Sequence, residues 1–596
     1  MRGRMDDVHV VLARSAPGFV GLQSVDDAGA AIGDAETVPV ERLPAVVAER
    51  EQDRPRWIWS DSRTWYPALL DAGVRIERVH DLRAAGAILA GSTFAARARV
   101  DHPPSPDWAA ALAAEASAPR GVPVAAAGTA LFDFDEFDAP APPAPDAETV
   151  VADPVAATVA EFARQQSLVA ASDAPGRLRL LLAAESAGTL IGVELQHAGL
   201  PWRRDVHESV LERALGPKPS PGRKPAKMAV LAGEVRDALE APALNLDSQT
   251  ELLKALQRAG IAVASTSRWE LADHAHPAVA PLLAYKKLAR LLSANGWTWL
   301  DEWIVGGRFR AEYVPGGTAT GRWATNGGGA LQLPKQVRSA VVADSGWKLV
   351  VADAAQLEPR VLAAMARDEA MADAARGRDL YAGLVERGVV ASRDEAKIAI
   401  LGAMYGATSG DAGRLVPRLA RAYPAAMALV DGAAREGERG GVVTTLLGRS
   451  SPLPPEGWRA VQARASEPGA VAAEERRARS AAREWGRFTR NFVVQGTAAE
   501  WALCWMAELR HRLAGIAPSP LGARRAGASG PAFELAPHLV FFLHDELIVH
   551  TPAALAPEVA DAVAESAEVA GRRLFGTFPV DFPLDLAVVD SYAETD

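Results

Sequence analysis

The stretch His538-Leu-Val-Phe-Phe-Leu-His-Asp-Glu-Leu-Ile-Val-His-Thr551 carries two adjacent carboxylates, Asp545 and Glu546, between two runs of strand-forming residues. β-Branched and aromatic residues on both sides predict a hairpin with the tripeptide His544-Asp545-Glu546 at its tip. Two carboxylates in an apolar setting repel each other, and a divalent cation relieves that repulsion. Taken alone, the tripeptide fits an exposed acidic turn better than a metal site.

A second group of carboxylates favours the metal site. Asp353-Ala-Ala-Gln-Leu-Glu358 follows the apolar run Leu349-Val-Val-Ala352, just as the first group follows an apolar strand. Further strands are expected at Arg308–Val314 and Trp347–Ala352, with helical segments between the strands. Because strands and helices do not alternate regularly, the sequence predicts an α+β fold rather than a doubly wound sheet.

Composition sets wider limits. The 596 residues are too many for one hydrophobic core, so several domains are expected. The net charge of −10 argues against a uniformly basic surface, although a local basic channel remains compatible with it. The single cysteine, Cys504, excludes an internal disulfide and a cysteine-rich zinc site, and it fits a reducing cytoplasm. The N-terminus lacks an apolar signal core, and no uncharged run is long enough to span a bilayer.

The chain has one clear spacer, the proline-rich segment Asp138–Asp146, which separates an N-terminal domain from the rest. After the spacer, helical periodicity predicts amphipathic helices at Leu178–Leu200 and Ser248–Gly260. Between these helices lies the basic, proline-rich segment Pro217–Lys227. This segment fits a solvated loop and a loop that follows phosphates about equally well.

A further helix is predicted after Ser392, which forms a capping box with Glu395. Residues four apart lie on one face of a helix. On this helix that face carries, in order, Arg393, Lys397, Leu401 and Tyr405. The face is either a solvated basic turn that leads into a buried stretch, or a clamp for a nucleoside triphosphate. In the second interpretation the cations bind phosphates and the apolar end packs on the nucleotide.

Glycines mark places where another group approaches the backbone closely. Gly402 and Gly406 fall in the predicted helix, where each costs about 1 kcal/mol relative to Ala. Thr318-Ala-Thr-Gly-Arg322 and Asn326-Gly-Gly-Gly329 place glycines around an arginine and small hydroxyl residues. Such a backbone suits close approach by a phosphate or by the edge of a nucleic-acid groove.

Another helix carries hydrogen-bonding side chains where a core helix would carry apolar ones. Arg487, Asn491 and Gln495 recur at four-residue spacing and therefore share one face. The run Gly496-Thr-Ala-Ala499 follows directly.

Together these residues resemble the family A DNA polymerases, the DNA polymerase I type, over about residues 175–590. The matching segments, in chain order, are Leu244–Leu253, Tyr285–Leu292, Thr320–Arg322, Asp353–Arg360, Arg393–Gly406, Arg487–Ala499 and His544–Glu546. Any one segment could match by chance, whereas the ordered set is specific. The resemblance implies a right-hand polymerase with palm, fingers and thumb, preceded by an RNase-H-like exonuclease-type α/β domain.

The resemblance also predicts domain bounds. These are an exonuclease-like domain at 1–137, a Pro/Ala linker at 138–150, thumb and connecting helices at 151–310, the first part of the palm at 311–366, fingers at 367–486 and the second part of the palm at 487–596. No 5′-nuclease domain is expected.

Roles for individual residues follow from the same resemblance. Asp353 and Asp545 would hold two Mg²⁺ ions, for which Mn²⁺ can substitute, with help from the backbone carbonyl of Ala354. Glu546 would support the site, and Lys397 would donate a proton to the leaving group. The residues implied in binding the dNTP are Arg393, Lys397, Leu401, Tyr405, Glu358, Gln356 and Tyr381, with Glu358 excluding the ribose 2′-hydroxyl. The residues implied in binding primer–template DNA are Arg322, Thr320, Gln332, Arg487, Asn491, Gln495 and His544.

The chain departs from the family pattern at four places, one of which is a pair of adjacent residues. Leu401 stands where the family has Phe or Tyr, Tyr381 replaces a His, and Phe542 replaces a Gln. Ala354 and Ala355 replace Tyr-Ser. None of these changes removes a metal-binding carboxylate, so activity is expected to survive with altered fidelity or speed.

The N-terminal domain departs further. The family's exonuclease domain has a first strand that ends in Asp-x-Glu, which holds two metal ions. Gly18–Leu22 resembles that strand, but Gln23-Ser-Val25 follows it. Arg56–Gly73 resembles the second exonuclease segment, with Thr64 or Trp65 in place of its Asp, and no third motif precedes the linker. The acidic residues Asp133, Asp135 and Glu136 fit a solvated segment better than a replacement site.

The leading prediction is therefore a cytoplasmic, monomeric, template-directed DNA polymerase that serves DNA replication or repair without proofreading. One alternative is a catalytically weak nucleic-acid-binding protein of the same fold, which the four departures motivate. Another is a 3′–5′ exonuclease, which the missing carboxylates disfavour.

Overall fold

The computed structural model describes residues 9–116, 153–272, 274–329, 333–377, 379–407, 410–520 and 524–595. Within it the chain forms two compact units. The first unit comprises Met1–Gly199, Glu312–Gly327 and Ser345–Val588, and the second comprises Leu200–Ala311, Gly328–Asp344 and Val589–Asp596. The predicted linker, the acidic residues Asp133, Asp135 and Glu136, and Gln332 lie outside the described residues. The predicted bounds of palm, fingers and thumb stay a prediction.

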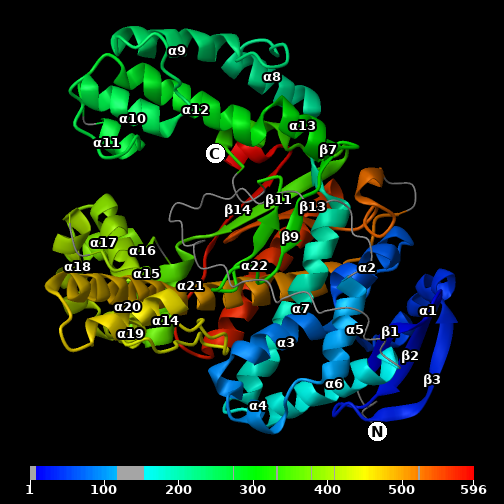
Figure 1. Ribbon diagram of the computed structural model, residues 1–596. Coiled ribbons are helices and arrows are strands. Elements are labelled where there is room, and N and C mark those ends of the chain that lie inside the picture. Colours follow the sequence, from blue (N-terminus) through cyan, green and yellow to red (C-terminus); the bar gives the residue numbers. More distant parts are fainter. Residues whose placement is uncertain are drawn as a thin grey trace. The chain divides into compact units, whose positions relative to one another are not determined.

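The N-terminal part of the first unit is a five-stranded mixed sheet with the strand order β3-β2-β1-β4-β5 (Figure 1). The strands are β1 (His9–Ala16), β2 (Phe19–Val25), β3 (Ala31–Pro39), β4 (Arg56–Trp59) and β5 (Arg78–Asp81). Strands β1, β2 and β3 pair antiparallel, whereas β4 pairs parallel to both β1 and β5. Parallel pairs need a crossover, and the helix α2 (Ser62–Asp71) supplies it between β4 and β5.

One sequence prediction about this sheet is wrong. Of the segment Gly18–Leu22, Phe19 to Leu22 belong to β2, the second strand, and not to the first strand of the exonuclease-like domain. The first strand is β1, which pairs with β2 across the turn at Pro17-Gly18, where Gly18 has φ of +79°. Both strands are apolar and end in polar residues, so the sequence pattern alone does not separate them.

Helices cover this sheet and connect it to the rest of the unit. They are α1 (Leu43–Arg50), α2, α3 (Leu82–Gly91), α4 (Ala98–Asp101), α5 (Pro106–Ala116), α6 (Pro154–Ala170) and α7 (Pro175–Ala198). The predicted helix Leu178–Leu200 corresponds to α7, which ends at Gly199 with φ of +68°. On α7, a Cβ at Gly188 would lie 2.8 Å from the side chain of Leu503, so Gly188 allows close packing.

A second sheet, of strand order β12-β13-β11-β14, forms the centre of the first unit. Its strands are β11 (Trp347–Ala354), β12 (His538–Leu543), β13 (Glu546–Pro552) and β14 (Leu584–Val589). The predicted hairpin is confirmed: β12 and β13 pair antiparallel, and β11 pairs antiparallel with β13. Leu349, Leu547 and Ile548 are fully buried, which explains why these strands are apolar throughout.

The predicted strand Arg308–Val314 is wrong as a single element. It divides into β8 (Arg308–Phe309) and β9 (Glu312–Val314), which belong to different sheets. Strand β9 pairs with β10 (Ala324–Asn326), whereas β8 pairs with β6 (Leu200–Pro201) and β7 (Ile304–Val305). Such short strands are defined by their partners and not by local propensity, so the sequence pattern could not show the division.

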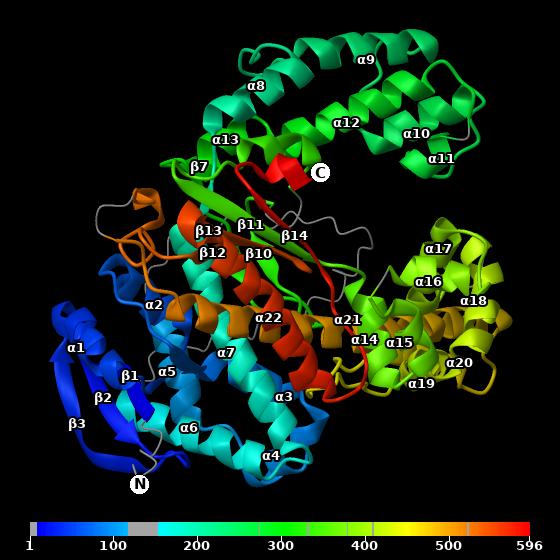
Figure 2. The same ribbon diagram turned by 180° about the vertical axis from the view of Figure 1, so that it is seen from behind.

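Two long helices pack beside the central sheet. Helix α21 (Ala472–Gly515) has 44 residues and is therefore about 66 Å long. Helix α22 (Ala556–Phe575) packs against α21 and also contacts β11 and β13 (Figure 2). Trp501 and Trp505 of α21 are fully buried, and Trp505 Nε1 donates a hydrogen bond to the carbonyl of Val563 on α22.

Seven shorter helices gather around the N-terminal half of α21 (Figure 1). They are α14 (Leu357–Ala366), α15 (Glu369–Ala375), α16 (Leu380–Glu386), α17 (Arg393–Tyr405), α18 (Gly410–Ala422), α19 (Pro424–Glu438) and α20 (Glu456–Ala465). The buried faces of α14 to α19 share one hydrophobic core with Phe492, Val493 and Val494 of α21, whereas α20 contributes no residue to it.

The two glycines predicted to mark close approach in α17 have different explanations. A Cβ at Gly402 would lie 2.6 Å from Ala412 Cβ, so Gly402 allows α18 to pack closely, as predicted. Gly406 does not lie inside the helix. It ends α17 in the left-handed conformation, with φ of +71°, and so incurs no interior helix penalty.

The second unit is mainly helical. Its helices are α8 (Arg204–Leu215), α9 (Ala226–Ala238), α10 (Gln249–Arg258), α11 (Arg268–Ala272), α12 (Val279–Asn295) and α13 (Trp297–Trp303). The predicted helix Ser248–Gly260 corresponds to α10, which Ser248 caps. Trp202, Trp299 and Phe309 form an aromatic cluster with centroid separations of 5.0–5.9 Å. In the described part of the chain, no helix is both long and apolar enough to cross a membrane.

Candidate active site

The turn between β12 and β13 places Asp545 beside the end of β11. His544 adopts a left-handed conformation with φ of +59°, which lets the chain reverse within two residues. The backbone N–H of Ala354 donates a 2.9 Å hydrogen bond to the carbonyl of Asp545. In the sheet register Asp353 lies opposite Glu546. The structure therefore brings Asp353, Asp545 and Glu546 together at one end of the central sheet.

Burial and neighbouring charges shift the pKa values of Asp545 and His544 in this turn. Burial, followed by repulsion from Asp353, raises the pKa of Asp545 to about 7. Burial, followed by the nearby Arg322 guanidinium, lowers the pKa of His544 to about 4. His544 is therefore neutral at neutral pH, and the ionised Asp545 needs a cation nearby.

The oxygen atoms at this site fit a hard divalent cation. Two aspartate carboxylates and the carbonyl of Ala354 are the ligand types that Mg²⁺ prefers, and Mg²⁺ commonly keeps water and phosphate as its other ligands. Among the described residues no group of three or more His, Cys, Asp and Glu side chains is arranged to hold a metal ion. The protein alone would therefore supply only part of the coordination shell.

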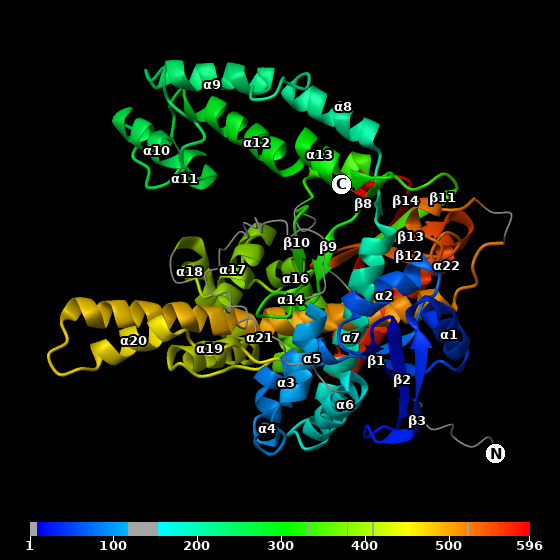
Figure 3. The same cartoon turned by 45° about the vertical axis from the view of Figure 1, so that its right-hand side comes forward.

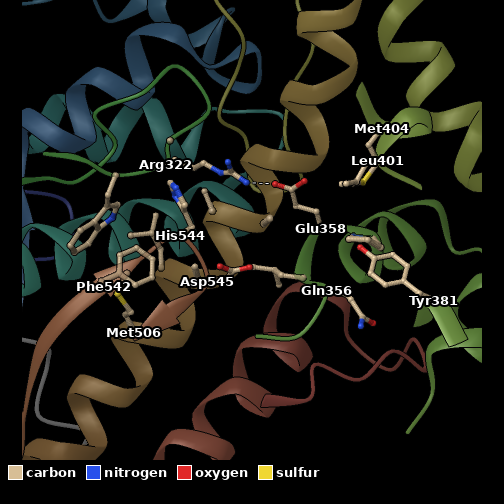
Figure 4. A pocket seen from close by; sticks show the side chains of 18 residues that line it. Arg322, Gln356, Glu358, Tyr381, Leu401, Met404, Met506, Phe542, His544 and Asp545 are labelled. Carbon is tan, nitrogen blue, oxygen red and sulfur yellow. Dashed lines mark hydrogen bonds and ion pairs between the residues drawn. The ribbon is translucent and has the colours of Figure 1, made fainter. Parts of the chain in front are cut away.

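Glu358 is held in a fixed position next to these carboxylates. Its Oε1 forms an ion pair with Arg322 Nη2, and its Oε2 accepts a 3.3 Å hydrogen bond from the hydroxyl of Tyr405 (Figure 4). Tyr405 also hydrogen-bonds with the side chain of Gln495 on α21. Burial, followed by the charge of Glu358, raises the pKa of Tyr405 to about 12, so the phenol stays protonated.

Arg393, the first residue of α17, is tied to Asp379. Its Nη2 lies 2.8 Å from Asp379 Oδ2, and its guanidinium lies 5.4 Å from the ring centroid of Tyr381. Gln356 Nε2 donates a 2.7 Å hydrogen bond to the same Asp379 oxygen.

The capping box predicted at Ser392 differs from the prediction in one hydrogen bond. Ser392 accepts from the N–H of Glu395, but Glu395 in turn accepts from Ala391.

A cavity joins the carboxylates to α17 (Figure 4). Its lining includes Asp545, Glu358 and Arg322 in the middle, Phe542 and Met506 at one side, and Leu401, Met404 and Tyr381 at the other. Leu401 and Tyr405 are half-buried, while Arg393 and Lys397 are exposed further along the same face of α17. The described cavity lining does not include Asp353, Arg393, Lys397 or Glu546.

The departures from the family pattern have local explanations. Phe542 packs edge-on against Trp323, with 5.1 Å between ring centroids, and its backbone N–H donates to the hydroxyl of Tyr313. An apolar residue suits that position better than an amide. Tyr381 is largely buried in the helical core beside α17. Leu401 fills less of the cavity than an aromatic ring would.

The predicted hydrogen-bonding face of α21 is present. Arg487 is exposed, whereas Asn491 is buried and its Oδ1 accepts no hydrogen bond from any described residue. Gln495 reaches Tyr405, as described above. Thr320 lies in a turn where its hydroxyl is 3.1 Å from that of Thr318. An unpartnered buried amide is costly, which favours a ligand or ordered water at Asn491.

Sequence analysis missed Arg449 as a support of this site. Arg449 Nη2 donates a 2.7 Å hydrogen bond to the buried carboxylate of Glu185 on α7. A Cβ at Gly321 would lie only 2.3 Å from Arg449 Nε, so the guanidinium lies directly against the backbone that precedes Arg322. No spacing pattern in the sequence marks Arg449, because its neighbours are distant along the chain.

The exonuclease-like sheet lacks the expected acids in its first strand. Strand β1 contains no Asp or Glu, and Trp65 on α2 is buried with its Nε1 donating to Ser60. Asp61 lies just after β4 and Asp81 is the last residue of β5, but they cap helices α2 and α3. Asp61 is further neutralised by ion pairs of 3.0 Å with Arg63 and Arg83.

Comparison with known proteins identifies the family. A model of "DNA polymerase family A" matches residues 225–593. DNA polymerase I, thermostable, of Thermus thermophilus is 29% identical over 363 residues, which are 56% of this chain and 38% of that protein. DNA polymerase I of Chloroflexus aurantiacus is 29% identical over 340 residues, which are 52% of this chain and 32% of that protein. The matched stretch thus covers about a third of the length of each of these relatives.

The fold has a counterpart among solved structures. The POL domain of Pol1 from M. smegmatis, solved in complex with DNA primer-template and dNTP, matches with a TM-score of 0.61 and 16% sequence identity. The match covers 100% of this chain and 96% of that one. Family A DNA polymerases generally use divalent metal ions, and the family model spans both Asp353 and Asp545. The chain belongs to DNA polymerase family A.

Proposed function

We propose that this protein is a template-directed DNA polymerase that adds deoxynucleotides to a primer 3′ end by two-metal nucleotidyl transfer, without proofreading. The observation that carries the proposal is the juxtaposition of Asp353 and Asp545 beside a cavity that reaches Leu401 and Met404 of α17, the helix that also carries Arg393 and Lys397. The partners are primer–template DNA and dNTPs. The protein acts as a monomer in the cytoplasm, where the buried Cys504 stays reduced.

Each group of residues has a proposed role in the reaction. Asp353 and Asp545 would hold two Mg²⁺ ions, with the Ala354 carbonyl as a further ligand and Glu546 as support. When bound, the ions lower the pKa of the primer 3′-hydroxyl and offset the charge of the leaving pyrophosphate. Arg393 and Lys397 lie one turn apart on α17, so both can contact the triphosphate. Lys397 Nζ then donates a proton to the pyrophosphate.

Nucleotide selection depends on Glu358. Because Arg322 and Tyr405 hold its carboxylate, the side chain cannot move away from a ribose 2′-hydroxyl without losing both contacts. Gln356, Leu401 and Tyr381 complete the nucleotide-binding set. The residues proposed to contact primer–template DNA are Arg322, Thr320, Gln332, Arg487, Asn491, Gln495 and His544.

A labelled primer–template tests the proposed function. With Mg²⁺ and dNTPs the wild-type protein is expected to extend the primer, and without dNTPs the primer is expected to keep its length. Binding with no extension under any divalent metal would favour the non-catalytic alternative. Shortening of the 3′ end without dNTPs would favour the exonuclease.

Loss of the Glu358 carboxylate is expected to weaken sugar selection. In Glu358→Ala, the ratio of kcat/KM for a dNTP to that for the matching rNTP should fall by on the order of 10–100-fold, because the group that rejects the 2′-hydroxyl is gone. Single-nucleotide incorporation measures both constants. Tyr405→Phe is a milder variant for comparison, because it keeps the Glu358 carboxylate but removes one of its two contacts. It should therefore lower the ratio less than Glu358→Ala does. An unchanged ratio in Glu358→Ala would contradict this role.

Mg²⁺ is expected to stabilise the protein more at pH 8 than at pH 6. The pKa of Asp545 is raised to about 7, above the ordinary value of 3.8, so the metal-free fold loses stability as pH rises from about 3.8 to 7, and that loss is complete above about pH 7. A cation that binds the ionised form removes that cost. Thermal melting with Mg²⁺, against an NaCl control of equal ionic strength, should show a rise in Tm at pH 8 that Asp545→Ala lacks. Equal stabilisation of both proteins would place the ion elsewhere.

A further inference from the structure

The loop at residues 316–322, which ends in Arg322, lies on a buried ion pair that has no part in the proposed reaction. Arg449 Nη2 lies 2.7 Å from Glu185 Oε2, and the two side chains are only 13% and 4% exposed. Burial raises the pKa of Glu185, and the nearby Arg449 guanidinium partly offsets that rise. Breaking such a pair leaves the other charge buried and uncompensated, so both side chains keep fixed positions.

Two glycines show that the backbone of this loop lies directly against the ion pair. A Cβ at Gly316 would overlap Glu185 Oε1, and a Cβ at Gly321 would overlap Arg449 Nε. Both glycines have positive φ, +61° and +85°, so a larger residue is disfavoured by conformation as well as by space. The ion pair therefore fixes both ends of the loop.

The loop in turn fixes the backbone of Arg322. The N–H of Gly321 donates to the carbonyl of Thr318 at 2.9 Å, and the N–H of Thr318 donates to the carbonyl of Arg322 at 3.1 Å. The Arg322 guanidinium forms the ion pair with Glu358 described above. A shift of the loop would therefore move the cation that holds the Glu358 carboxylate.

Arg449 belongs to a tight turn that is attached to α21. The turn, Thr444–Ser450, is closed by an antiparallel β-bridge between its two ends, and the N–H of Thr445 donates to the carbonyl of Arg449 at 2.8 Å. Glu500 of α21 accepts hydrogen bonds from Thr445 Oγ1 and from the backbone N–H of Leu447. The backbone that carries the guanidinium is therefore held in place.

The N-terminal region also contacts this turn. Ser92 Oγ, at the end of α3, donates a 2.7 Å hydrogen bond to the carbonyl of Gly448. The N–H of Thr93 donates to Ser450 Oγ at 2.9 Å, and the Thr93 hydroxyl lies 2.8 Å from that of Thr444. Helix α7, which carries the carboxylate of the ion pair, contacts β5 and α3 as well as β9 and α21 (Figure 3). Both members of the ion pair are therefore attached to the N-terminal region.

We propose that Glu185 and Arg449 are positioning residues for sugar selection. They fix the loop at residues 316–322, so that Arg322 keeps Glu358 beside the 2′-position of the incoming nucleotide. The inference rests on the proposed function. The described cavity lining includes neither member of the ion pair, so the pair acts through Arg322. The N-terminal region, whose first strand contains no Asp or Glu, thereby has a role in selecting the nucleotide.

Removal of the Glu185 charge is expected to weaken sugar selection without stopping the reaction. Glu185→Gln keeps the shape of the side chain but leaves Arg449 without its counter-charge. The ratio of kcat/KM for a dNTP to that for the matching rNTP should fall by on the order of 3–10-fold, less than in Glu358→Ala, because the Glu358 carboxylate is displaced and not removed. The value for the rNTP should rise, while kcat for the dNTP should change by less than about twofold. Single-nucleotide incorporation measures these constants.

Glu161→Gln is the matched control. Glu161 is 1% exposed and pairs with Arg164 at 2.7 Å, and it also lies in the N-terminal region. Its hydrogen bonds with Arg164 and Gln165 stay within α6. The change should therefore destabilise the fold to a similar extent, which urea denaturation checks, and should leave the ratio unchanged.

Further variants test whether the contacts act together. If Glu185 and Arg449 act as a pair, Glu185→Gln combined with Arg449→Gln should lower the ratio no more than the more severe single change does. Strictly additive losses would contradict a shared role. Ser92→Ala combined with Thr93→Val removes two hydroxyl contacts with the turn and should lower the ratio by about twofold. An unchanged ratio in that variant would overturn the role of the N-terminal region.

Amide hydrogen exchange, followed by mass spectrometry, gives a measurement that needs no activity. In the nucleotide-free protein, the peptide that covers residues 316–322 should exchange at least about threefold faster in Glu185→Gln than in wild type or in Glu161→Gln. Unchanged exchange or an unchanged ratio in Glu185→Gln would overturn the inference, as would an equal loss of the ratio in Glu161→Gln. If wild type does not extend a primer, the proposed function is rejected, and the exchange comparison still decides whether the ion pair holds the loop.

Discussion

Replacing Asp545 by Ala is expected to slow primer extension by more than about a thousandfold, because the change removes a carboxylate that holds the metal ions at the reacting atoms. Asp353→Ala should have a comparable effect, since the sheet register places Asp353 at the same site. Glu546→Ala should be much milder, because Glu546 begins β13 and is proposed only to support Asp545. Single-turnover rates under saturating Mg²⁺ and dNTP measure all three losses.

A control variant that removes one carboxylate elsewhere in the sheet distinguishes loss of the metal site from damage to the sheet. Asp585→Ala removes an exposed carboxylate from β14, in the same sheet as Asp353, and should leave the rate unchanged. Circular dichroism should show that each variant keeps its fold. If Asp545→Ala extends a primer as well as wild type does, the two-metal assignment is wrong. If Glu546→Ala loses as much as Asp545→Ala, the division of roles between the two carboxylates is wrong.

The hairpin that holds Asp545 could be predicted because its information is local. Two apolar strands flank a short polar turn, and both strands are found almost within the predicted bounds. The face of α17 could be predicted for the same reason, since a four-residue spacing fixes which side chains lie together. The grouping of Asp353 with Asp545 came from family resemblance, since nothing local links residues so far apart in the chain.

What could not be predicted depends on tertiary contacts. The ion pair between Arg322 and Glu358 joins two segments that were assigned to different ligands, DNA and nucleotide. The contact of Arg449 with the backbone at Gly321 has no signature in the sequence. The order of the first two strands was mistaken because β1 and β2 have the same apolar pattern, and only their pairing with β3 and β4 distinguishes them.

The second large effect is expected from a buried ion pair that joins the N-terminal sheet region to α21. Arg510 on α21 contacts Glu194 on α7, with 2.7 Å between Nη2 and Oε1. Arg75 and the hydroxyl of Tyr66 bond to the same carboxylate at 3.2 and 2.7 Å. Arg510 also donates to the backbone carbonyls of Ile76 and Glu77. Three side chains therefore donate to this one buried carboxylate.

Glu194→Ala is expected to lower the free energy of unfolding by about 3–5 kcal/mol, because it leaves the buried Arg510 without a counter-charge. Burial alone would raise the pKa of Glu194, but Arg510 and Arg75 outweigh it and lower that pKa to about 2. Since the folded pKa lies below the ordinary value of 4.5, this stabilisation is complete above about pH 4.5 and is lost as pH falls towards 2. Urea denaturation at pH 7 measures the loss of unfolding free energy.

Glu568→Ala is the control, because it breaks an exposed pair with Arg572 and should cost less than about 0.5 kcal/mol. Equal costs for the two variants would mean that the buried pair does not hold the N-terminal sheet region to α21.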